Sequence, residues 1–142
     1  MYQKDYILRM IEMIGELIAG ILGLIKKGDF SQASKELGRI YYQMLREDSS
    51  FFRTIPEEEL THKLLQEHNY TGGHLEILAE LFNAEAELEL AQGNKAGSLE
   101  CSRKSLILFE FIDKEQKTFS FERADKMTAI GKRIKALQAE LI

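Results

Sequence analysis

Residues 74–113 decide the predicted fold, and they have the sequence HLEILAELFNAEAELELAQGNKAGSLECSRKSLILFEFID. The turn-forming residues Gln92-Gly93-Asn94 divide this stretch into two helices. At about 100° per residue, the first helix has two apolar stripes on nearly opposite faces: Leu75, Leu78, Ala79, Phe82, Ala86 and Leu90, and Ile77, Leu81, Ala84, Leu88 and Ala91. Because a helix that is apolar on two faces packs between neighbours, the chain is predicted to be all-α, with this helix in its inner layer.

The rest of the chain supplies the neighbours of this central pair. Hydrophobic periodicity predicts four further helices, over residues 5–27, 29–46, 56–67 and 120–141. The break at Gly28 is so short that the first two of these must form an antiparallel hairpin. We therefore expect antiparallel hairpins stacked as an array of about six helices, in one domain of residues 1–142.

Several local features refine this expectation. Asp5 is placed to cap the first helix, and Thr54 with Glu57 has the spacing of a capping box for the short third helix. In the first helix, Gly15, Ala19 and Gly23 recur every four residues and form one flat face. Small residues let helix backbones approach closely, so this face is predicted to pack inside the core.

Composition narrows the classes of function. The net charge of −4 argues against a nucleic-acid partner, which needs a basic surface. The longest apolar run, residues 17–25, is much shorter than the ~20 residues that span a membrane. No small-residue cleavage site follows it, as a signal peptide would require. The single cysteine, Cys101, excludes an internal disulfide, and a cytoplasmic location is expected.

Two hairpins in the chain share a pattern. The first contains Gly28-Asp29-Phe30-Ser31-Gln32-Ala33, and the second has Gly93, Asn94 and the small residue Ser98 at matching places, followed by Ser105-Leu106-Ile107-Leu108. This pattern resembles the tetratricopeptide repeat, whose helix break has the form G-[DN]-[YF]-x-x-A. The likeness covers roughly residues 14–45 and 79–110. The two glycines are 65 residues apart, whereas the family repeats every 34.

A second likeness concerns the N-terminus. Residues 5–11, with the sequence DYILRMI, are similar to the start of a family of small, uncharacterised bacterial proteins. That likeness implies no activity.

The tetratricopeptide resemblance implies a non-enzymatic module for protein–protein interaction. In that family the first helix of each repeat lines a concave groove that binds peptides, which places Glu80, Asn83 and Glu87 in the groove of the second copy. The matching positions of the first copy are mostly apolar: Gly15, Ile18, Leu22, Ile25 and Lys26. An acidic strip favours a basic or polar protein or peptide partner. The alternative is that these three residues form a solvated helix face.

The last predicted helix has a narrow apolar seam, with spacing typical of a coiled coil. Its members are Met127, Ile130, Ile134, Leu137 and Leu141. This seam could close the open end of the stack or pair with a second chain. The run at residues 106–112, LILFEFI, is apolar nearly all round. So much apolar surface is hard to cover in a small stack, and a homodimer is therefore predicted.

The alternative function is a small metal- or ligand-binding protein that uses His62, His68 and His74. Glu59 and His62 have the i, i+3 spacing found in di-metal helical bundles, but no second Glu-x-x-His occurs. A zinc site needs the turn at residues 69–73 to bring the three histidines together.

Other candidate chemistry is weaker. Residues 71–73, Thr-Gly-Gly, precede a helix and are interpreted as a turn and cap rather than an anion site. Cys101 is interpreted as a packed thiol rather than a reactive one. Since the chain has no catalytic-triad or phosphate-loop motif, neither an enzyme nor a cofactor is expected.

Overall fold

The computed structural model describes residues 2–116 and 119–141, which form helices and turns without a strand. The helices are α1 (Tyr2–Lys26), α2 (Phe30–Leu45), α3 (Ser49–Arg53), α4 (Leu60–His62), α5 (Gly72–Ala91), α6 (Lys95–Glu115) and α7 (Phe121–Glu140). A 3₁₀ turn, η1 (Glu57–Glu59), precedes α4, and a π turn, η2 (Lys63–Glu67), follows it. The predicted all-α class is confirmed, with seven α-helical segments in the described residues rather than about six.

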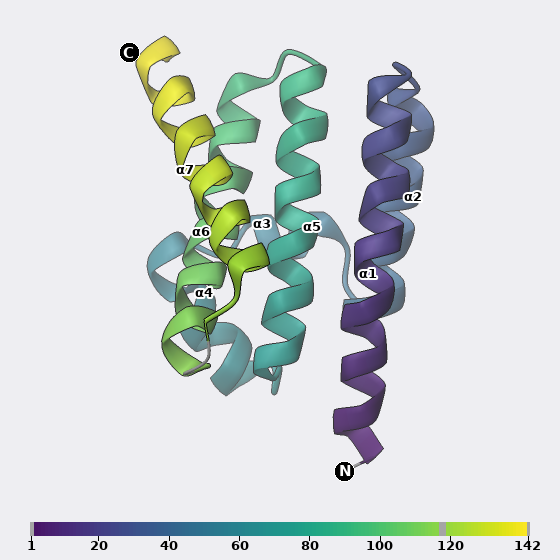
Figure 1. Ribbon diagram of the computed structural model, residues 1–142, viewed down its shortest axis with the longest axis vertical. Helices are drawn as coiled ribbons and strands as arrows, with labels where there is room; N and C mark the ends of the chain where they lie inside the picture. The colour runs from purple at the N-terminus through teal and green to yellow at the C-terminus, as the bar shows by residue number, and fades with distance from the viewer. Residues whose placement is uncertain (1, 117–118, 142) are drawn as a thin grey trace.

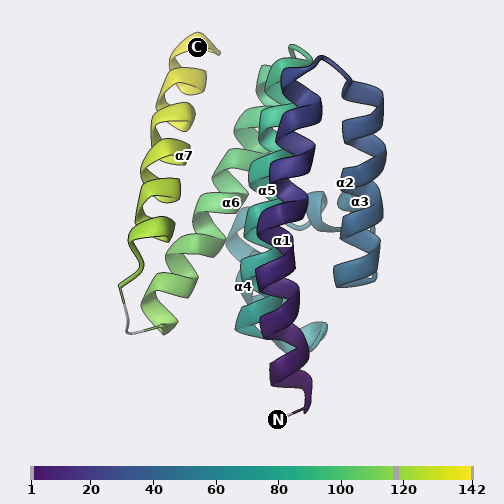
Figure 2. The same cartoon turned by 45° about the vertical axis from the view of Figure 1, so that its right-hand side comes forward.

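The helices form two layers around α5 (Figures 1 and 2). In the near layer of Figure 1, α1, α5 and α7 run in the same direction. Behind them α2 and α6 run the opposite way, with α2 paired to α1 and α6 paired to both α5 and α7. α5 packs against α1, α2 and α6 and buries residues around most of its circumference, as its two apolar stripes predict. No helix in the described part of the chain is long and apolar enough to cross a membrane.

The two hairpins turn through the residues on which the repeat-like pattern was recognised. Gly28 and Gly93 adopt φ values of +81° and +86°, a left-handed conformation that favours glycine at a helix C-terminus. The next residue caps the following helix in both cases. Asp29 accepts a hydrogen bond from the Gln32 amide at 3.3 Å, and Asn94 accepts one from the Gly97 amide at 3.0 Å.

An aromatic cluster links α2, the crossing segment and α5. The rings of Tyr41 and Phe52 stack at 6.0 Å, and Tyr41 meets Phe82 edge to face at 6.5 Å. All three side chains are fully buried. Such ring pairs add about 0.5–1.5 kcal/mol beyond the burial of their area. The cluster therefore holds α3 against α2 and connects both to α5.

Two local predictions are wrong, and one short helix was not predicted. The first helix begins at Tyr2, so Asp5 lies inside it and is not its cap. The sequence also did not predict the short helix α3, which begins at Ser49 and is capped by Asp48, whose carboxylate accepts a hydrogen bond from the Phe51 amide. Thr54 forms no capping box with Glu57, since its hydroxyl donates to the Phe51 carbonyl at 2.8 Å.

The small-residue face of α1 is also not packed in the core. Gly15 and Ala19 are exposed, and a Cβ atom placed at Gly15 would have no heavy atom within 4 Å. The buried side of α1 is formed instead by Met10, Ile14, Ile18 and Ile21. Gly15 lies on the flank of α1 that faces the space between α1 and α7.

Candidate binding cleft

A cleft lies between α1 and α7 and has α5 as its floor. It has a volume of about 320 Å³. α1 contributes Ile11, Glu12 and Gly15 to the lining, and α5 contributes Glu76 and Glu80. Gly15 lies about one turn after Ile11 and Glu12, and Glu80 lies one turn after Glu76, so the residues of each set share one side of their helix.

A larger groove continues from the cleft along the first turns of α1. It has a volume of about 870 Å³ and shares Ile11 and Glu76 with the cleft. Tyr6, Ile7 and Leu8 line one wall, and the other wall is the start of α5 with the turn before it. Tyr6 and Leu8 are 56% and 51% exposed, so they form an apolar surface that the chain leaves uncovered.

The strip predicted to face a partner is covered over much of its length by α7. Arg133 donates to Asn83 at 2.6 Å, to Glu87 at 2.5 Å and to Ser102 at 2.8 Å. Lys126 forms an ion pair with Glu80, whose residue is only 9% exposed. Glu80, Asn83 and Glu87 therefore do share one face, but cations of the same chain bind them.

The lower end of the strip remains open. Glu12 and Glu76 have no hydrogen bond or ion pair among the side chains that the structure describes. Glu122 forms a long ion pair with Lys126, at 3.8 Å. Burial raises the pKa of Glu76, because no direct partner compensates its desolvation. Four carboxylates and two cations line this part of the cleft. One of the cations, Arg123, already binds Asp113 at 2.5 Å.

The apolar seam of α7 is used mainly inside the chain. Ile130, Ile134 and Leu137 are buried in contact with the rest of the array, Met127 is half-buried and Leu141 is 45% exposed. α7 packs on α6, where the 106–112 run has its own buried residues, Leu108, Phe109 and Ile112. The seam thus packs largely inside the array, and its pairing with a second chain stays a prediction.

The three histidines do not converge. His62 and His68 are exposed, and the His68 ring lies edge to face against Phe51 at 5.1 Å. His74 Nδ1 instead accepts a hydrogen bond from the Thr71 amide at 3.0 Å, while the Thr71 hydroxyl accepts one from the His74 amide at 3.4 Å. Across residues 2–116 and 119–141, no group of three His, Cys, Asp or Glu side chains is arranged to hold a metal ion.

This reciprocal cap makes a pH-dependent contribution to stability. Burial lowers the pKa of His74 below its ordinary value of about 6.5, so the neutral ring is favoured in the folded state. The contribution is therefore complete above pH ~6.5 and is lost as the pH falls through the lowered folded-state pKa.

The His74→Gln variant should retain the cap and lose this pH dependence, because Gln is a regular partner at this position of a capping box. Urea unfolding of the wild type and the variant from pH 8 to 5 measures the pH dependence of the free energy of unfolding. The wild type should lose up to about 1 kcal/mol more than the variant, which is the value of one cap. Parallel stability curves would contradict the assignment.

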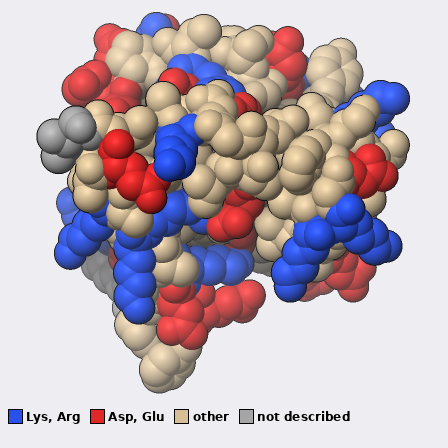
Figure 3. All heavy atoms as spheres, turned by 90° about the horizontal axis from the view of Figure 1, so that it is seen from above, with Lys and Arg blue, Asp and Glu red and all other residues tan. Residues whose placement is uncertain are grey.

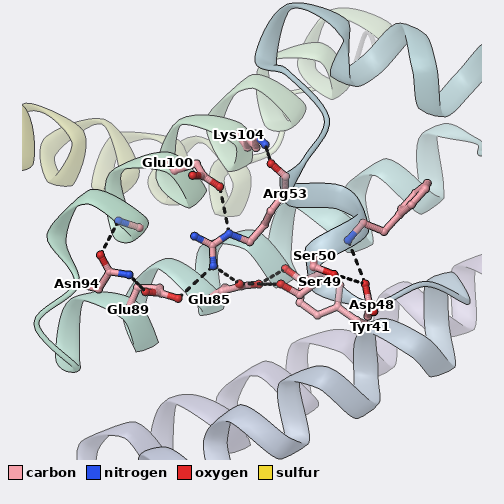
Figure 4. A network of polar contacts seen from close by, with 12 residues as sticks. Tyr41, Asp48, Ser49, Ser50, Arg53, Glu85, Glu89, Asn94, Glu100 and Lys104 are labelled. Atoms are coloured by element: carbon pink, nitrogen blue, oxygen red, sulfur yellow. Dashed lines mark hydrogen bonds and ion pairs between the residues drawn. The ribbon is translucent and has the colours of Figure 1, made fainter.

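The most extensive polar network lies on the other side of α5, around Glu85 (Figure 4). Glu85 is 6% exposed and accepts hydrogen bonds from Tyr41 at 2.6 Å and from Ser49 at 2.8 and 2.9 Å. Arg53 Nη1 lies 2.9 Å from Glu85 and 3.1 Å from Glu89, and its Nε lies 3.1 Å from Glu100. These contacts fix the crossing segment to α2, α5 and α6.

Two further groups complete this region. The buried Lys104 donates to the Arg53 carbonyl at 2.5 Å, which anchors the end of α3 to α6. Cys101 is fully buried, and burial raises its pKa well above the usual value. Sequence reasoning missed the partners of Glu85, which lie in α2 and α3. The available signal was a glutamate confined between two apolar stripes.

Searches against protein-family models, curated proteins and solved structures found no match to the chain. The resemblance to the tetratricopeptide repeat therefore rests on the residues of the chain itself.

Proposed function

We propose that the chain is a non-enzymatic protein-interaction module that holds a segment of another protein in the cleft between α1 and α7. The observation that carries this proposal is the continuous depression along α1, which joins an apolar groove to a carboxylate-lined cleft through Ile11 and Glu76. A concave surface with an apolar wall and a few polar groups is the usual form of a binding site. The partner would lie where α7 leaves the α5 strip open.

The remaining polar chemistry supports a binding role. The carboxylate of Glu85 is held by three donors within the protein, and the raised pKa of Cys101 makes its thiol a poor nucleophile. Acidic and basic side chains are mixed over the end of the molecule in Figure 3, so this end has no uninterrupted basic area for a phosphate backbone. A protein segment is the partner class that fits an apolar groove beside a mixed charged surface.

Two glycines of α1 provide a matched test of the cleft. Gly15 lines the cleft, whereas Gly20 does not; both are exposed, and a Cβ atom at either position would meet no heavy atom within 4 Å. Gly15→Trp should fill the cleft without disturbing the fold. Gly20→Trp makes the same chemical change on another side of α1.

Phage display of random peptides of about 15 residues, a length that can form a helix, supplies the ligands. Peptides selected on the wild type should bind Gly20→Trp with unchanged affinity and Gly15→Trp at least about tenfold more weakly, as steric exclusion from the cleft requires. Circular dichroism and urea unfolding of both variants would establish that their folds are equal. If no peptide is enriched, or if enriched peptides bind Gly15→Trp as well as wild type, the cleft is not the binding site.

A further inference from the structure

We propose that the occupant of this cleft is an amphipathic helix of a partner protein, with its apolar face on α1 and its basic edge over the carboxylates of the cleft. The inference rests on the proposed function and names the chemistry of the partner. It follows from three features: the apolar wall of α1, the excess of carboxylates over cations in the lining, and the way in which α5 already holds α7.

The wall of α1 suits a helix lying alongside it. Ile7, Leu8 and Ile11 form its lower apolar part, and Gly15 follows one turn above Ile11. Ala19, which is also exposed, lies one further turn along the same face. Exposed small residues at this spacing allow the backbone of a second helix to approach closely.

The charge of the lining selects for cations. Glu12 is exposed, Glu76 is half-buried, and neither forms an ion pair among the described side chains. Lys126 binds Glu80, and Arg123 binds Asp113. Both cations also act on Glu76 through space, but the lining has four carboxylates for two cations. A Lys or Arg beside the apolar face of the partner helix would complement this excess.

α7 shows how the acidic strip of α5 receives a helix. Two long cationic side chains of α7 bind the strip, Lys126 on Glu80 and Arg133 on Asn83 and Glu87. The apolar residues Ile130, Ile134 and Leu137 of α7 are buried away from solvent. A partner helix on the α1 side would use the same division, with apolar residues against one helix and cations over the α5 carboxylates. Glu76 continues the strip one turn before Glu80.

The test uses three labelled helical peptides of about 15 residues, a length at which a helix in isolation becomes stable. One has a Leu stripe flanked by Lys, the second replaces the Lys residues by Glu, and the third replaces the Leu residues by Ser. Fluorescence anisotropy measures binding to the wild type, to the double variant E12Q/E76Q and to the control E58Q/E59Q. The control removes the same charge from two exposed glutamates outside the cleft.

We expect the Leu–Lys peptide to bind the wild type and the control equally, and E12Q/E76Q about tenfold more weakly, the size of effect that two partly desolvated charge pairs give. Both altered peptides should bind at least tenfold more weakly than the Leu–Lys peptide. Gly15→Trp should abolish binding, and Gly20→Trp should leave it unchanged. Equal weakening by E58Q/E59Q would show that only net charge matters and would overturn the proposal.

The experiment also separates this inference from the proposed function. Gly15→Trp could exclude the peptides selected by phage display while the Leu–Lys peptide binds E12Q/E76Q as tightly as the wild type. In that case the cleft binds protein segments of another chemistry, and only the inference fails. Sedimentation of the chain without peptide tests whether a second copy of the chain occupies the cleft. A dimer that Gly15→Trp dissociates, without peptide binding, would make a second copy the occupant and overturn the basic helix.

Discussion

Replacing Arg53 by Met should lower the free energy of unfolding by about 3 kcal/mol, because it leaves a buried carboxylate without its cation. Glu85 would keep the hydroxyl donors of Tyr41 and Ser49 but lose the guanidinium at 2.9 Å. Met fills much of the volume of the Arg stem, so the loss reports mainly on charge. The same substitution releases Glu89 and Glu100, which are more exposed and contribute less.

Urea unfolding of four proteins isolates this interaction. They are the wild type, Arg53→Met, Glu85→Gln and the double variant, which has neither buried charge. The double variant should lose about 1–3 kcal/mol less free energy of unfolding than the two single variants lose together, since residues in one network couple. Arg39→Met is the matched control: Arg39 pairs with Glu36 at 2.6 Å, but both side chains are substantially exposed, so it should cost less than about 1 kcal/mol. Additive losses would show that Glu85 does not depend on Arg53.

The Glu85 network explains how an irregular crossing can be placed accurately. Between α2 and α5 the chain has only short helical segments, which contribute little stability of their own. Arg53 stands at the end of α3 and contacts both α5 and α6, while Lys104 holds its carbonyl. The rear layer is thereby fixed against α5, and the cleft on the opposite side of α5 keeps its shape.

The features that sequence predicted best are local. Gly28 and Gly93 end helices because only glycine adopts positive φ without strain, and Asp29 and Asn94 cap the helices that follow. The double apolar face of α5 likewise required a helix on each side. These inferences need only the chemistry of adjacent residues and the 3.6-residue period.

What sequence could not supply is the identity of partners distant along the chain. A helical wheel places Glu80 and Glu87 on one face, but it does not show that Lys126 and Arg133, 46 residues further on, cover that face. Gly15 and Ala19 have the spacing of a packed face, yet both are exposed in the part of the chain that the structure describes. The same small residues can serve a core or an open cleft, and only the position of the neighbouring helix decides between them.

The junction that closes the lower end of this cleft gives the second large effect. Gly73, near the start of α5, lines the groove, and a Cβ atom there would lie 2.1 Å from Ile7 Cγ2 and 3.5 Å from Ile7 Cβ. Ile7 is branched at Cβ, so its methyl group cannot move away without a shift of α1. Gly73→Ala should therefore cost about 1–3 kcal/mol, the typical penalty of overpacking, although Ala is the better helix former.

A double-mutant cycle tests this explanation, because the effect of Gly73→Ala on stability should change sign when Ile7 is shortened. In an Ile7→Ala background the clash is absent, and Gly73→Ala should then stabilise the chain by up to about 1 kcal/mol through helix propensity. Gly72→Ala is the matched control, because a Cβ atom there meets nothing within 4 Å. Urea unfolding measures all of these variants. If Gly73→Ala is as harmless as Gly72→Ala in the wild-type background, α1 is not held on α5 at this point.

The same cycle connects stability to binding. Gly73→Ala displaces the first turns of α1, where Ile7, Leu8 and Ile11 form the apolar wall of the groove, and leaves the Glu85 network on the other side of α5 untouched. Gly73→Ala should therefore weaken the binding of the Leu–Lys peptide. Ile7→Ala combined with Gly73→Ala should restore α1 to its position. Recovery of affinity in the double variant, despite the loss of one apolar side chain, would show that the spacing between α1 and α5 determines whether a partner helix fits.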